Sequence, residues 1–457
     1  MKVYYHTLSL CPNANVASWP TIRESIPNCE EVELEEADVI IAFFCAMTID
    51  EIQLAKTELE ELIKFKREHR RVRLIVGGCL QSVNRLRENY KEVYDLLCTN
   101  EIDCLFSREA MVEDILSFLG FRRKPLVPIS FIDDAVAVIQ IASGCNRKCS
   151  FCKSWYLDMP YRFLPMEVVM DAVDSAVKLG ATRLDITGEN ITEYDTDCSG
   201  RSQLIVLLKR IIREFPSIKI INLSGIALDE MDEYLFRFIL NQPKIRAIQL
   251  EVQSLDQNVR RAMGLTKSVG DAMRMVTELS KEHNVRSSIM AGHPGETTEG
   301  VYRQLRLIND NNMYYLEPNK YINTPQTRSY GMEQISEEMV TNHLTLMLGT
   351  IVRLRARYVA GVLGKTIPMY VVGMASDYHI LLPVGGTIRV TVRKMDGIRI
   401  GDYVNCYIDS YKPWGSGSGQ SIEYQRRQLM SVPLDPVIMM SLLSPVDNEI
   451  YLGGQIK

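Results

Sequence analysis

Three cysteines stand close together near the first third of the chain, in the stretch GCNRKCSFC. Cys145, Cys149 and Cys152 follow a C-x3-C-x2-C spacing directly after AVAVIQIAS, an apolar run that predicts a buried strand. A structural zinc site uses four protein ligands, usually as two pairs, but the next cysteine downstream is the lone Cys198. Three thiolates can hold an iron–sulfur cluster and leave one iron open for a coordinating ligand. The spacing therefore predicts an open iron–sulfur site.

Three further cysteines repeat at equal intervals in the first part of the chain. Cys11, Cys45 and Cys79 are 34 residues apart, and each follows a predicted strand. Because the carboxyl ends of parallel strands meet at one ligand-binding edge of a sheet, we expect these thiols to lie together. Again three thiols are offered, so this trio predicts a second cluster with an open iron. The other cysteines are expected to be core or loop thiols: Cys29, Cys98, Cys104, Cys198 and Cys406.

The overall composition bounds the class of protein. With 457 residues, of which 46% are hydrophobic, the chain can form two or three domains with cores of their own. A formal net charge of -5 argues against strong nonspecific binding to nucleic acid. No apolar run reaches the length of a membrane span, and MKVYYHTLSL lacks the features of an export signal. We expect a cytoplasmic protein with no membrane partner, whose cysteines are thiols or metal ligands.

Two regions of alternating strands and helices are expected to carry the cysteines. Residues 1–125 read as a doubly wound parallel sheet, with strands at 2–7, 37–44, 73–78 and 103–107 and a helix at 51–69. Residues 135–350 contain six strand-like runs separated by helical segments, which is typical of a full or partial (β/α) barrel. In both folds, ligands bind at the carboxyl ends of the strands. The fold class is therefore α/β.

The remainder of the chain changes to a β-rich pattern. Short apolar runs broken by glycines predict a small antiparallel β-barrel, assigned to residues 360–430. The preceding helix carries Arg353, Arg355 and Arg357, which add positive charge if they face solvent. Residues 431–457 are apolar with several prolines and are expected to form a C-terminal tail that the pattern does not place.

The order of these parts resembles the radical S-adenosylmethionine (SAM) methylthiotransferases, and the chain looks like a divergent member of that family. The resemblance extends over nearly the whole chain, to about residue 412. The segments that carry it are GGCLQS, SGCNRKCSFC, LDITGEN, QLEVQSLDQNVRRAMG, IMAGHPGETTEG and YINTPQT. The terminal β-barrel resembles the TRAM domain, a substrate-binding module of the family.

The resemblance implies two 4Fe-4S clusters and SAM as cofactors. It implies that the amino and carboxylate groups of SAM bind the open iron of the cluster at Cys145, Cys149 and Cys152. The residues that it assigns to SAM follow the ends of the strands: Phe151 near the adenine, Gly188, Glu189 and Asn190 at the amino group, Gln253 and Ser254 at the ribose or carboxylate, and Gly292 and Pro294 where backbone approaches the ligand. Helix capping or tight-turn chemistry would also explain the TGEN and AGHPGET loops.

The family's reaction would carry over as follows. Reduction of the first cluster, by a donor such as a flavodoxin or ferredoxin, cleaves SAM to a 5′-deoxyadenosyl radical that takes hydrogen from an unactivated substrate carbon. The cluster at Cys11, Cys45 and Cys79 carries a sulfur that a second SAM methylates. The resulting methylthio group is delivered to the carbon radical. The reaction requires the two clusters to face one substrate atom.

Departures from the family pattern concern the substrate. Family members usually follow the third cysteine with a proline and then a basic segment, whereas this chain reads KSWYLDMPYRFLP and keeps only Arg162. QSLD replaces a glycine-containing segment, and His293 stands where an aromatic is usual. Family substrates are adenosines near the tRNA anticodon, a ribosomal-protein aspartate and ribosomally made peptides. The acidic total, the lost basic segment and the extra tail narrowly favour a protein or peptide side chain over tRNA.

Three other functions compete with this interpretation. One is a radical SAM enzyme of another reaction type that uses an extra cluster for electron transfer only. Another is a non-catalytic RNA- or protein-binding module, against which the intact cysteine triad argues. A third, a nucleotide-triphosphate enzyme suggested by GVLGKT, fails because the phosphate-loop pattern requires glycine where Val359 stands.

Overall fold

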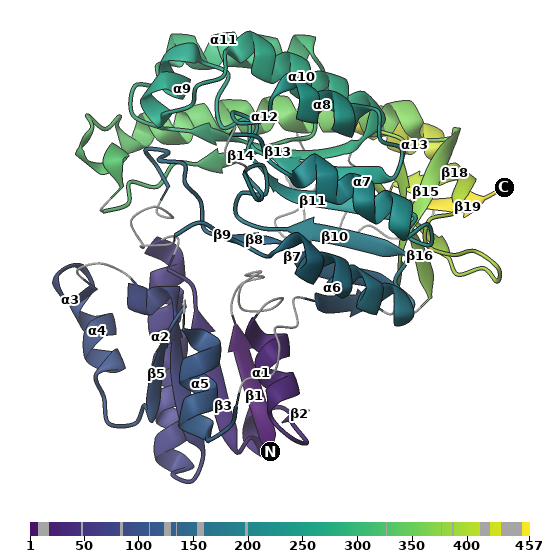
Figure 1. Cartoon of the computed structure of the whole chain (residues 1–457). Helices are drawn as coiled ribbons and strands as arrows, with labels where there is room; N and C mark the ends of the chain where they lie inside the picture. The colour runs from purple at the N-terminus through teal and green to yellow at the C-terminus, as the bar shows by residue number, and fades with distance from the viewer. Residues whose placement is uncertain are drawn as a thin grey trace.

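The computed structural model describes residues 1–7, 18–46, 49–82, 86–108, 110–122, 129–133, 135–152, 160–196, 200–325, 327–375, 377–385, 388–411, 421–430 and 450–457. They form an N-terminal α/β domain, a central α/β domain and a C-terminal β-barrel (Figure 1). In Figure 1 the N-terminal domain, in purple to blue, lies below the central domain, and the β-barrel, in yellow-green, lies at its right-hand side. The predicted α/β fold class is confirmed.

The N-terminal domain is a five-stranded parallel sheet within the described residues, with strand order β2-β1-β3-β4-β5. The central strand β3 reads VIIAFF and is buried along its whole length, as expected for a parallel sheet covered on both faces by helices. The strands are β1 (Lys2–Thr7), β2 (Glu30–Glu31), β3 (Val39–Phe44), β4 (Arg73–Gly78) and β5 (Cys104–Ser107). The helices are α1 (Trp19–Ser25), η2 (Leu34–Glu36), α2 (Ile49–Glu68), η3 (Cys79–Ser82), α3 (Leu86–Asn89), α4 (Lys91–Leu97) and α5 (Met111–Leu119).

The central domain is an open sheet of seven strands in the described part of the chain, in the order β14-β13-β12-β11-β10-β7-β6. Six strands run parallel: β7 (Val136–Gln140), β10 (Arg183–Thr187), β11 (Ile220–Ile226), β12 (Ile245–Leu250), β13 (Asn284–Ala291) and β14 (Leu316–Lys320). The edge strand β6 (Ile129–Asp133) is antiparallel to β7. Because β14 and β6 end the sheet without pairing to each other, this domain is a partial barrel.

Helices follow the parallel strands and cover the outer face of this sheet (Figure 1). Their apolar sides join the strands in one continuous core. Side-chain caps begin several of them; the Asp232 and Thr297 side chains, for example, accept from backbone N–H groups in the first turn. The helices are α6 (Met166–Lys178), α7 (Leu204–Glu214), α8 (Glu233–Leu240), α9 (Gln257–Met263), α10 (Val269–Glu282), α11 (Thr298–Asp310), η4 (Arg328–Gly331) and α12 (Glu337–Val362).

The C-terminal domain closes into a barrel in the order β15-β16-β17-β19-β18. Its elements are β15 (Thr366–Ala375), β16 (Tyr378–Pro383), β17 (Ile388–Arg393), β18 (Tyr403–Tyr411), α13 (Ile422–Met430) and β19 (Ile450–Ile456). Strand β19 differs from the expectation of a separate tail at 431–457, because it pairs with both β17 and β18 and completes the barrel. A Cβ atom at Gly454 would lie 2.7 Å from Cys406 Sγ, so glycine permits this close pairing.

The barrel packs against the amino ends of the central strands. The Nη1 atom of Arg183, the first residue of β10, donates to Val372 O at 2.7 Å. Ile220, the first residue of β11, packs with Val372, Leu382 and Ile400 of the barrel. The barrel therefore lies at the opposite end of the sheet from the loop that holds Cys145. None of the described helices combines the length and apolar character that crossing a membrane requires.

Candidate functional site

The cysteine loop follows the carboxyl end of the first parallel strand of the central domain. The short ribbon of β8 (Ala142–Ser143) and β9 (Arg162–Phe163) flanks it. Cys149 is buried, with 8% of its surface exposed, while Cys145 and Cys152 are half-buried. The loop thus lies where this fold places ligands, at the carboxyl edge of the sheet.

Polar contacts at the start of the loop lead away from the thiols. The backbone N–H of Gly144 donates to Glu189 Oε2 at 3.1 Å, and the Asn146 amide donates to Glu193 Oε2 at 3.1 Å. Both acceptors lie in the segment after β10, so two neighbouring strand ends are joined. Because these groups bond outward, they hold the loop backbone without using the cysteine side chains.

Ser150 fixes the second half of the loop. Its backbone N–H donates to Met263 O at 2.9 Å, and its carbonyl accepts from the Ser329 N–H at 2.9 Å. Its hydroxyl lies 2.9 Å from His293 Nε2, while His293 Nδ1 faces Pro294 O at 2.9 Å. Since a carbonyl only accepts, the proton of neutral His293 belongs on Nδ1, and Ser150 donates to Nε2. Burial lowers the pKa of His293 to about 4, which keeps the ring neutral.

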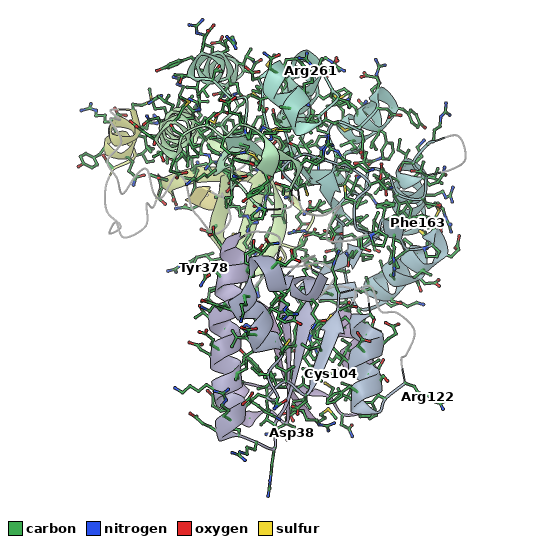
Figure 2. The ribbon with its side chains drawn as sticks, turned by 90° about the vertical axis from the view of Figure 1, so that its left-hand side faces the viewer. Asp38, Cys104, Arg122, Phe163, Arg261 and Tyr378 are labelled. Atoms are coloured by element: carbon green, nitrogen blue, oxygen red, sulfur yellow. The ribbon has the colours of Figure 1, made fainter. Side chains whose placement is uncertain are left out.

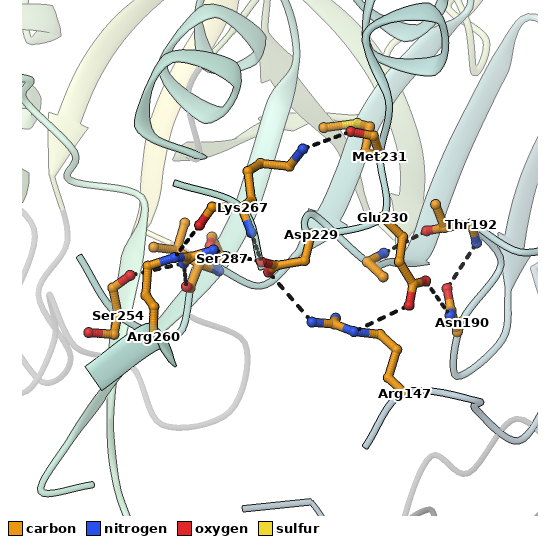
Figure 3. A network of polar contacts seen from close by, with 12 residues as sticks. Arg147, Asn190, Thr192, Asp229, Glu230, Met231, Ser254, Arg260, Lys267 and Ser287 are labelled. Atoms are coloured by element: carbon orange, nitrogen blue, oxygen red, sulfur yellow. Dashed lines mark hydrogen bonds and ion pairs between the residues drawn. The ribbon is translucent and has the colours of Figure 1, made fainter. Parts of the chain in front are cut away.

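A buried charge network surrounds Arg147, the middle residue between the first two cysteines (Figure 3). Its guanidinium lies 3.5 Å from Asp229 Oδ2 and 3.5 Å from Glu230 Oε1. Asp229 Oδ1 in turn accepts from Arg260 Nη2 at 2.9 Å, and Asn190 Nδ2 donates to Glu230 Oε2 at 2.7 Å. The network ties the loop to the segments after β10 and β11 and to α9.

The donor groups of the loop suit an iron–sulfur cluster. Burial, with a smaller contribution from Cys152, raises the pKa of Cys149 to about 11, and burial raises the pKa of Cys145 to about 12. The phenol oxygen of Tyr161 is buried without a hydrogen-bond partner among the described residues, and burial raises its pKa, with Cys145 among the smaller contributors. Three neighbouring thiols and an unpaired phenol form a site in which iron cations and a bound ligand would supply the missing partners.

The fit rests on residue type and spacing. Among the described residues, no three His, Cys, Asp or Glu side chains form a preformed metal site. The loop backbone is nevertheless fixed from both sides by the contacts of Gly144 and Ser150.

The residues predicted to meet the SAM amino group lie directly beside the cysteine loop. A Cβ atom at Gly188 would lie 2.6 Å from Ala142 O, so glycine is required for the close approach of the two strand ends. Glu189 accepts from Gly144, as described above. Asn190 is buried and donates to Glu230, so its described contact supports the charge network around Arg147.

The predicted residues after β12 divide into two groups. Gln253 is half-buried and has a φ of 63°, a left-handed conformation that is strained for a residue other than glycine. Its backbone is held by Ser288 O at 3.0 Å and by the N–H of Met290 at 2.8 Å. Ser254 is fully buried, and its hydroxyl donates to Gln304 Oε1 at 3.1 Å, so it does not face an open surface in this structure.

The AGHPGET loop after β13 and the ring of Phe151 lie next to each other. Phe151 contacts His293 edge to face, with ring centroids 6.3 Å apart. Gly292 N donates to Glu296 Oε1 at 2.8 Å, and Pro294 O accepts from His293. The AGHPGET loop thus supports the cysteine loop through His293. In the sequence, His293 stood out only because an aromatic residue is usual at that position in the family.

The N-terminal cysteines follow the carboxyl ends of their strands, as expected. Cys45 comes directly after β3, and Cys79 begins η3 directly after β4; they are 8% and 3% exposed. Cys11 lies outside the described residues. The strand order 2-1-3-4-5 reverses direction between β1 and β3, and folds of this kind bind ligands at that switch point. Cys45 and Cys79 lie at the carboxyl edge of this sheet.

One ion pair joins the edges of the two domains. Arg108, just after β5, donates from Nη2 to Glu189 Oε1 at 2.5 Å. Since Glu189 also contacts Gly144, the carboxyl edge of the N-terminal sheet lies against the cysteine loop of the central domain. Figure 2 agrees, because Asp38, which precedes β3, lies at the far end of the N-terminal domain.

Sequence reasoning missed the charged residues that build this site: Arg108, Arg147, Asp229, Glu230 and Arg260. Arg147 and the Asp229–Glu230 pair had a usable signal, since charged residues within a cysteine loop and just after a strand lie at the expected ligand-binding edge. The Arg108 contact had none, because it joins positions 81 residues apart in different domains.

Comparison with known proteins agrees with this arrangement. The model of the radical SAM superfamily matches residues 139–308. The threonylcarbamoyladenosine tRNA methylthiotransferase MtaB of Rickettsia prowazekii is 27% identical over 322 residues, covering 68% of this chain and 75% of that protein. The ribosomal protein uS12 methylthiotransferase RimO of Dictyoglomus thermophilum is 22% identical over 412 residues, covering 83% and 90%. RimO of Clostridium botulinum (strain Loch Maree) is 28% identical over 339 residues, covering 68% and 73%.

Solved structures show weaker likeness. The radical SAM methyltransferase TsrM from Kitasatospora setae has a TM-score of 0.49 at 12% identity, covering 70% of this chain and 74% of that one. The cobalamin-dependent radical SAM enzyme OxsB has a TM-score of 0.48 at 11% identity, and the match covers 77% of this chain but only 56% of OxsB. Both TM-scores lie below 0.5, so the fold assignment rests on the strand orders described above.

A partial (β/α) barrel with three cysteines after its first parallel strand, matched by the superfamily model, defines a radical SAM protein. Within that superfamily, the chain is similar to the methylthiotransferases, since the curated relatives MtaB and RimO carry that name. The predicted resemblance is therefore confirmed.

Proposed function

We propose that the chain replaces a C–H bond of a macromolecular substrate with C–S–CH3. The observation that carries this proposal is the Arg108–Glu189 contact, because it brings the edge with Cys45 and Cys79 against the edge with the Cys145 loop. Two sulfur-rich edges that face each other suit a reaction in which one site activates a carbon and the other delivers sulfur. An electron donor such as a flavodoxin or ferredoxin would act as partner.

The residues that would hold each group follow from their placement. Cys145, Cys149 and Cys152 would hold one 4Fe-4S cluster, and Cys11, Cys45 and Cys79 would hold another. When bound, the first cluster and SAM supply a hydrogen-abstracting radical, and the second cluster supplies sulfur. Glu189 accepts from the residue before the first cysteine and would bind the SAM ammonium group, while Phe151 offers an apolar ring beside the loop.

The protein groups around the loop would keep its geometry constant during the reaction. The Arg147 network and the Ser150–His293 contact fix the backbone on both sides of Cys149. Burial of Cys149 limits access of water, which would otherwise react with a radical intermediate. Neutral His293 accepts a hydrogen bond from Ser150 without adding charge near the thiols.

We place the substrate carbon on a protein or peptide side chain. The chain has a formal net charge of -5, which does not favour tRNA. Of the three arginines expected to add a basic surface before the barrel, Arg355 is only 2% exposed and donates to Tyr314 O and Leu316 O within the core. The barrel itself packs at the end of the sheet away from the cysteines, so a peptide can reach them without contacting it.

The proposal is tested by comparing a deletion strain with its complemented parent by mass spectrometry of proteins, peptides and tRNA nucleosides. We expect one protein or peptide to lose a methylthio group in the deletion strain while tRNA nucleosides stay unchanged. Loss of a methylthio group from tRNA instead would overturn the substrate but keep the reaction. Unchanged methylthiolation in every fraction, with clusters present in the purified protein, would favour a cluster used only for electron transfer.

A further inference from the structure

The Arg108–Glu189 ion pair lies between two domains and directly beside the cysteine loop. Arg108 is almost completely buried, with 4% of its side chain exposed, whereas 23% of the Glu189 side chain remains accessible. Glu189 uses Oε1 for Arg108 and Oε2 for the N–H of Gly144, which immediately precedes Cys145. A buried cation and a partly accessible anion therefore stand side by side where a ligand of the first cluster would arrive.

Other buried arginines in the described structure have a different environment. Arg260 and Arg355 direct their guanidinium groups toward partners in their own domain: the Val252 and Ser254 carbonyls and the Asp229 carboxylate for Arg260, and the Tyr314 and Leu316 carbonyls for Arg355. Such contacts fix a fold. The described contact of Arg108 is instead with a side-chain carboxylate of another domain, at a ligand-binding edge.

A guanidinium beside a carboxylate is complementary to an α-amino acid. The ammonium group of the zwitterion suits Glu189, and its carboxylate suits Arg108, because guanidinium groups bind carboxylates through charge-assisted hydrogen bonds. In the absence of ligand the two side chains neutralise each other, so neither buried charge is left uncompensated. A zwitterion that enters between them replaces the Arg108–Glu189 ion pair with two ion pairs, one to each side chain, and leaves the net charge unchanged.

We propose that Arg108 of the N-terminal domain binds the carboxylate of the methionine end of SAM while Glu189 binds its ammonium group. This inference rests on the proposed function, since it takes SAM as the ligand. It makes the SAM site complete only when the N-terminal domain is in place, so SAM binding reports on the contact between the domains. A carboxylate has two oxygens and accepts from several groups, so the contact is compatible with coordination to the open iron.

The test measures equilibrium binding by calorimetry to the cluster-reconstituted full-length protein, without reductant so that SAM is not consumed. The ligands are SAM and decarboxylated SAM, which keeps the ammonium group and lacks the carboxylate. The variants are Arg108→Gln and Arg108→Lys. Arg122→Gln is the matched control, because Arg122 is an exposed arginine of the same domain that projects outward from it (Figure 2).

We expect Arg108→Gln to weaken SAM binding by roughly tenfold to a hundredfold, the range for losing a hydrogen bond to a charged group. Binding of decarboxylated SAM should stay unchanged, so the preference of the protein for SAM should shrink by the same factor. Arg108→Lys should retain part of that preference, and Arg122→Gln all of it. A purely structural arginine would lower the affinity for both ligands equally, which would overturn the proposal.

Tighter SAM binding by Arg108→Gln would also overturn it, because that result would make Arg108 a competitor for Glu189. If Arg108→Gln does not fold, a reduced preference for SAM in Arg108→Lys, with decarboxylated SAM bound at wild-type strength, would support the proposal, and an undiminished preference would refute it. A wild-type protein that binds neither ligand would refute the proposed function itself, which distinguishes the two failures.

Discussion

The residues between the cysteines of the central loop direct their polar side chains toward neighbouring strand ends. Asn146 contacts Glu193, Arg147 contacts the Asp229–Glu230 pair, and Ser150 contacts His293. The loop therefore depends on these neighbouring side chains. Among them, Asp229 contacts two arginines at once, so its substitution should lower the stability of the domain most.

Asp229→Asn should destabilise the central domain. Asp229 is buried, and without its charge the fully buried guanidinium of Arg260 keeps no carboxylate partner. Breaking a buried ion pair by removing one partner costs about 3–5 kcal/mol, so we expect a loss of about 3 kcal/mol in the free energy of unfolding. The measurement is urea unfolding of the apoprotein. The exposed pair of Arg237 and Glu233 supplies the control, and Arg237→Gln should leave the unfolding midpoint unchanged.

An unchanged midpoint for Asp229→Asn would contradict this prediction and show that the buried Arg260 does not need a charged partner. In that case the amide would replace the carboxylate as acceptor for the Lys267 N–H, which lies 2.8 Å from Asp229 Oδ1.

At the scale of elements, the two α/β domains position their reactive residues in the same way, at the ends of parallel strands that share one edge of the sheet. β3 and β4 carry Cys45 and Cys79 in one domain, and β7 with β8 carries the cysteine loop in the other. The barrel is built differently, because β19, from the end of the chain, closes it by pairing with both β17 and β18.

Gly454→Val should open this closure. An added Cβ at Gly454 would meet Cys406 Sγ at 2.7 Å and Tyr407 O at 2.9 Å, so a larger side chain must displace one of the two strands. Cys406 is fully buried in the native barrel, and its alkylation under native conditions, followed by mass spectrometry, should become faster. Gly361→Ala, at a helical position with no atom within 4 Å of an added Cβ, should leave the rate unchanged. An unreactive Cys406 in Gly454→Val would show that β19 is dispensable for burying it.

The junction between α10 and β13 predicts a pH dependence of stability. Burial lowers the pKa of His283 from its ordinary value of 6.5, although its contacts with Ile245 O and Leu240 O oppose this effect. The unfolded chain therefore binds more protons than the folded chain around and below pH 6.5, and stability falls as the pH decreases through that value. Above it, this contribution is fully present.

His283→Gln should reduce that fall, because glutamine can donate to the same carbonyls without titrating. Urea midpoints measured between about pH 5 and pH 8 for both proteins provide the comparison. Parallel curves would contradict the prediction.

Local patterns predicted much of the fold. β1 and β4 have the expected bounds, 2–7 and 73–78, because apolar runs bounded by polar residues are local signals. β19 was not predicted, because its short IYLGGQI pattern contains two glycines, which usually argue against a strand. Glycine is needed there because an added Cβ would meet Ser410 or Cys406 of another strand. Arg355 was expected to add surface charge, but its carbonyl partners come from β14 and the turn before it, which a helical pattern cannot reveal.

For the whole molecule, the decisive feature is that two carboxyl edges face each other through Arg108 and Glu189. The cysteine spacing predicted each edge separately, since Cys145, Cys149 and Cys152 are neighbours in sequence and Cys45 and Cys79 follow equivalent strands. Their mutual orientation depends on tertiary contacts between domains, which the sequence does not display. The proposed reaction therefore requires two separable clusters in one chain.

The most direct test of this requirement is the iron content of the anaerobically reconstituted Cys45→Ala protein, measured together with 5′-deoxyadenosine formation from SAM. Two 4Fe-4S clusters give roughly eight iron atoms per wild-type chain, and we expect roughly four in Cys45→Ala with SAM cleavage retained. Cys149→Ala should lose SAM cleavage and keep the other cluster, and Cys406→Ala should match the wild type in both measurements. A Cys45→Ala protein that retains the wild-type iron content would contradict the second cluster and, with it, the proposed delivery of sulfur.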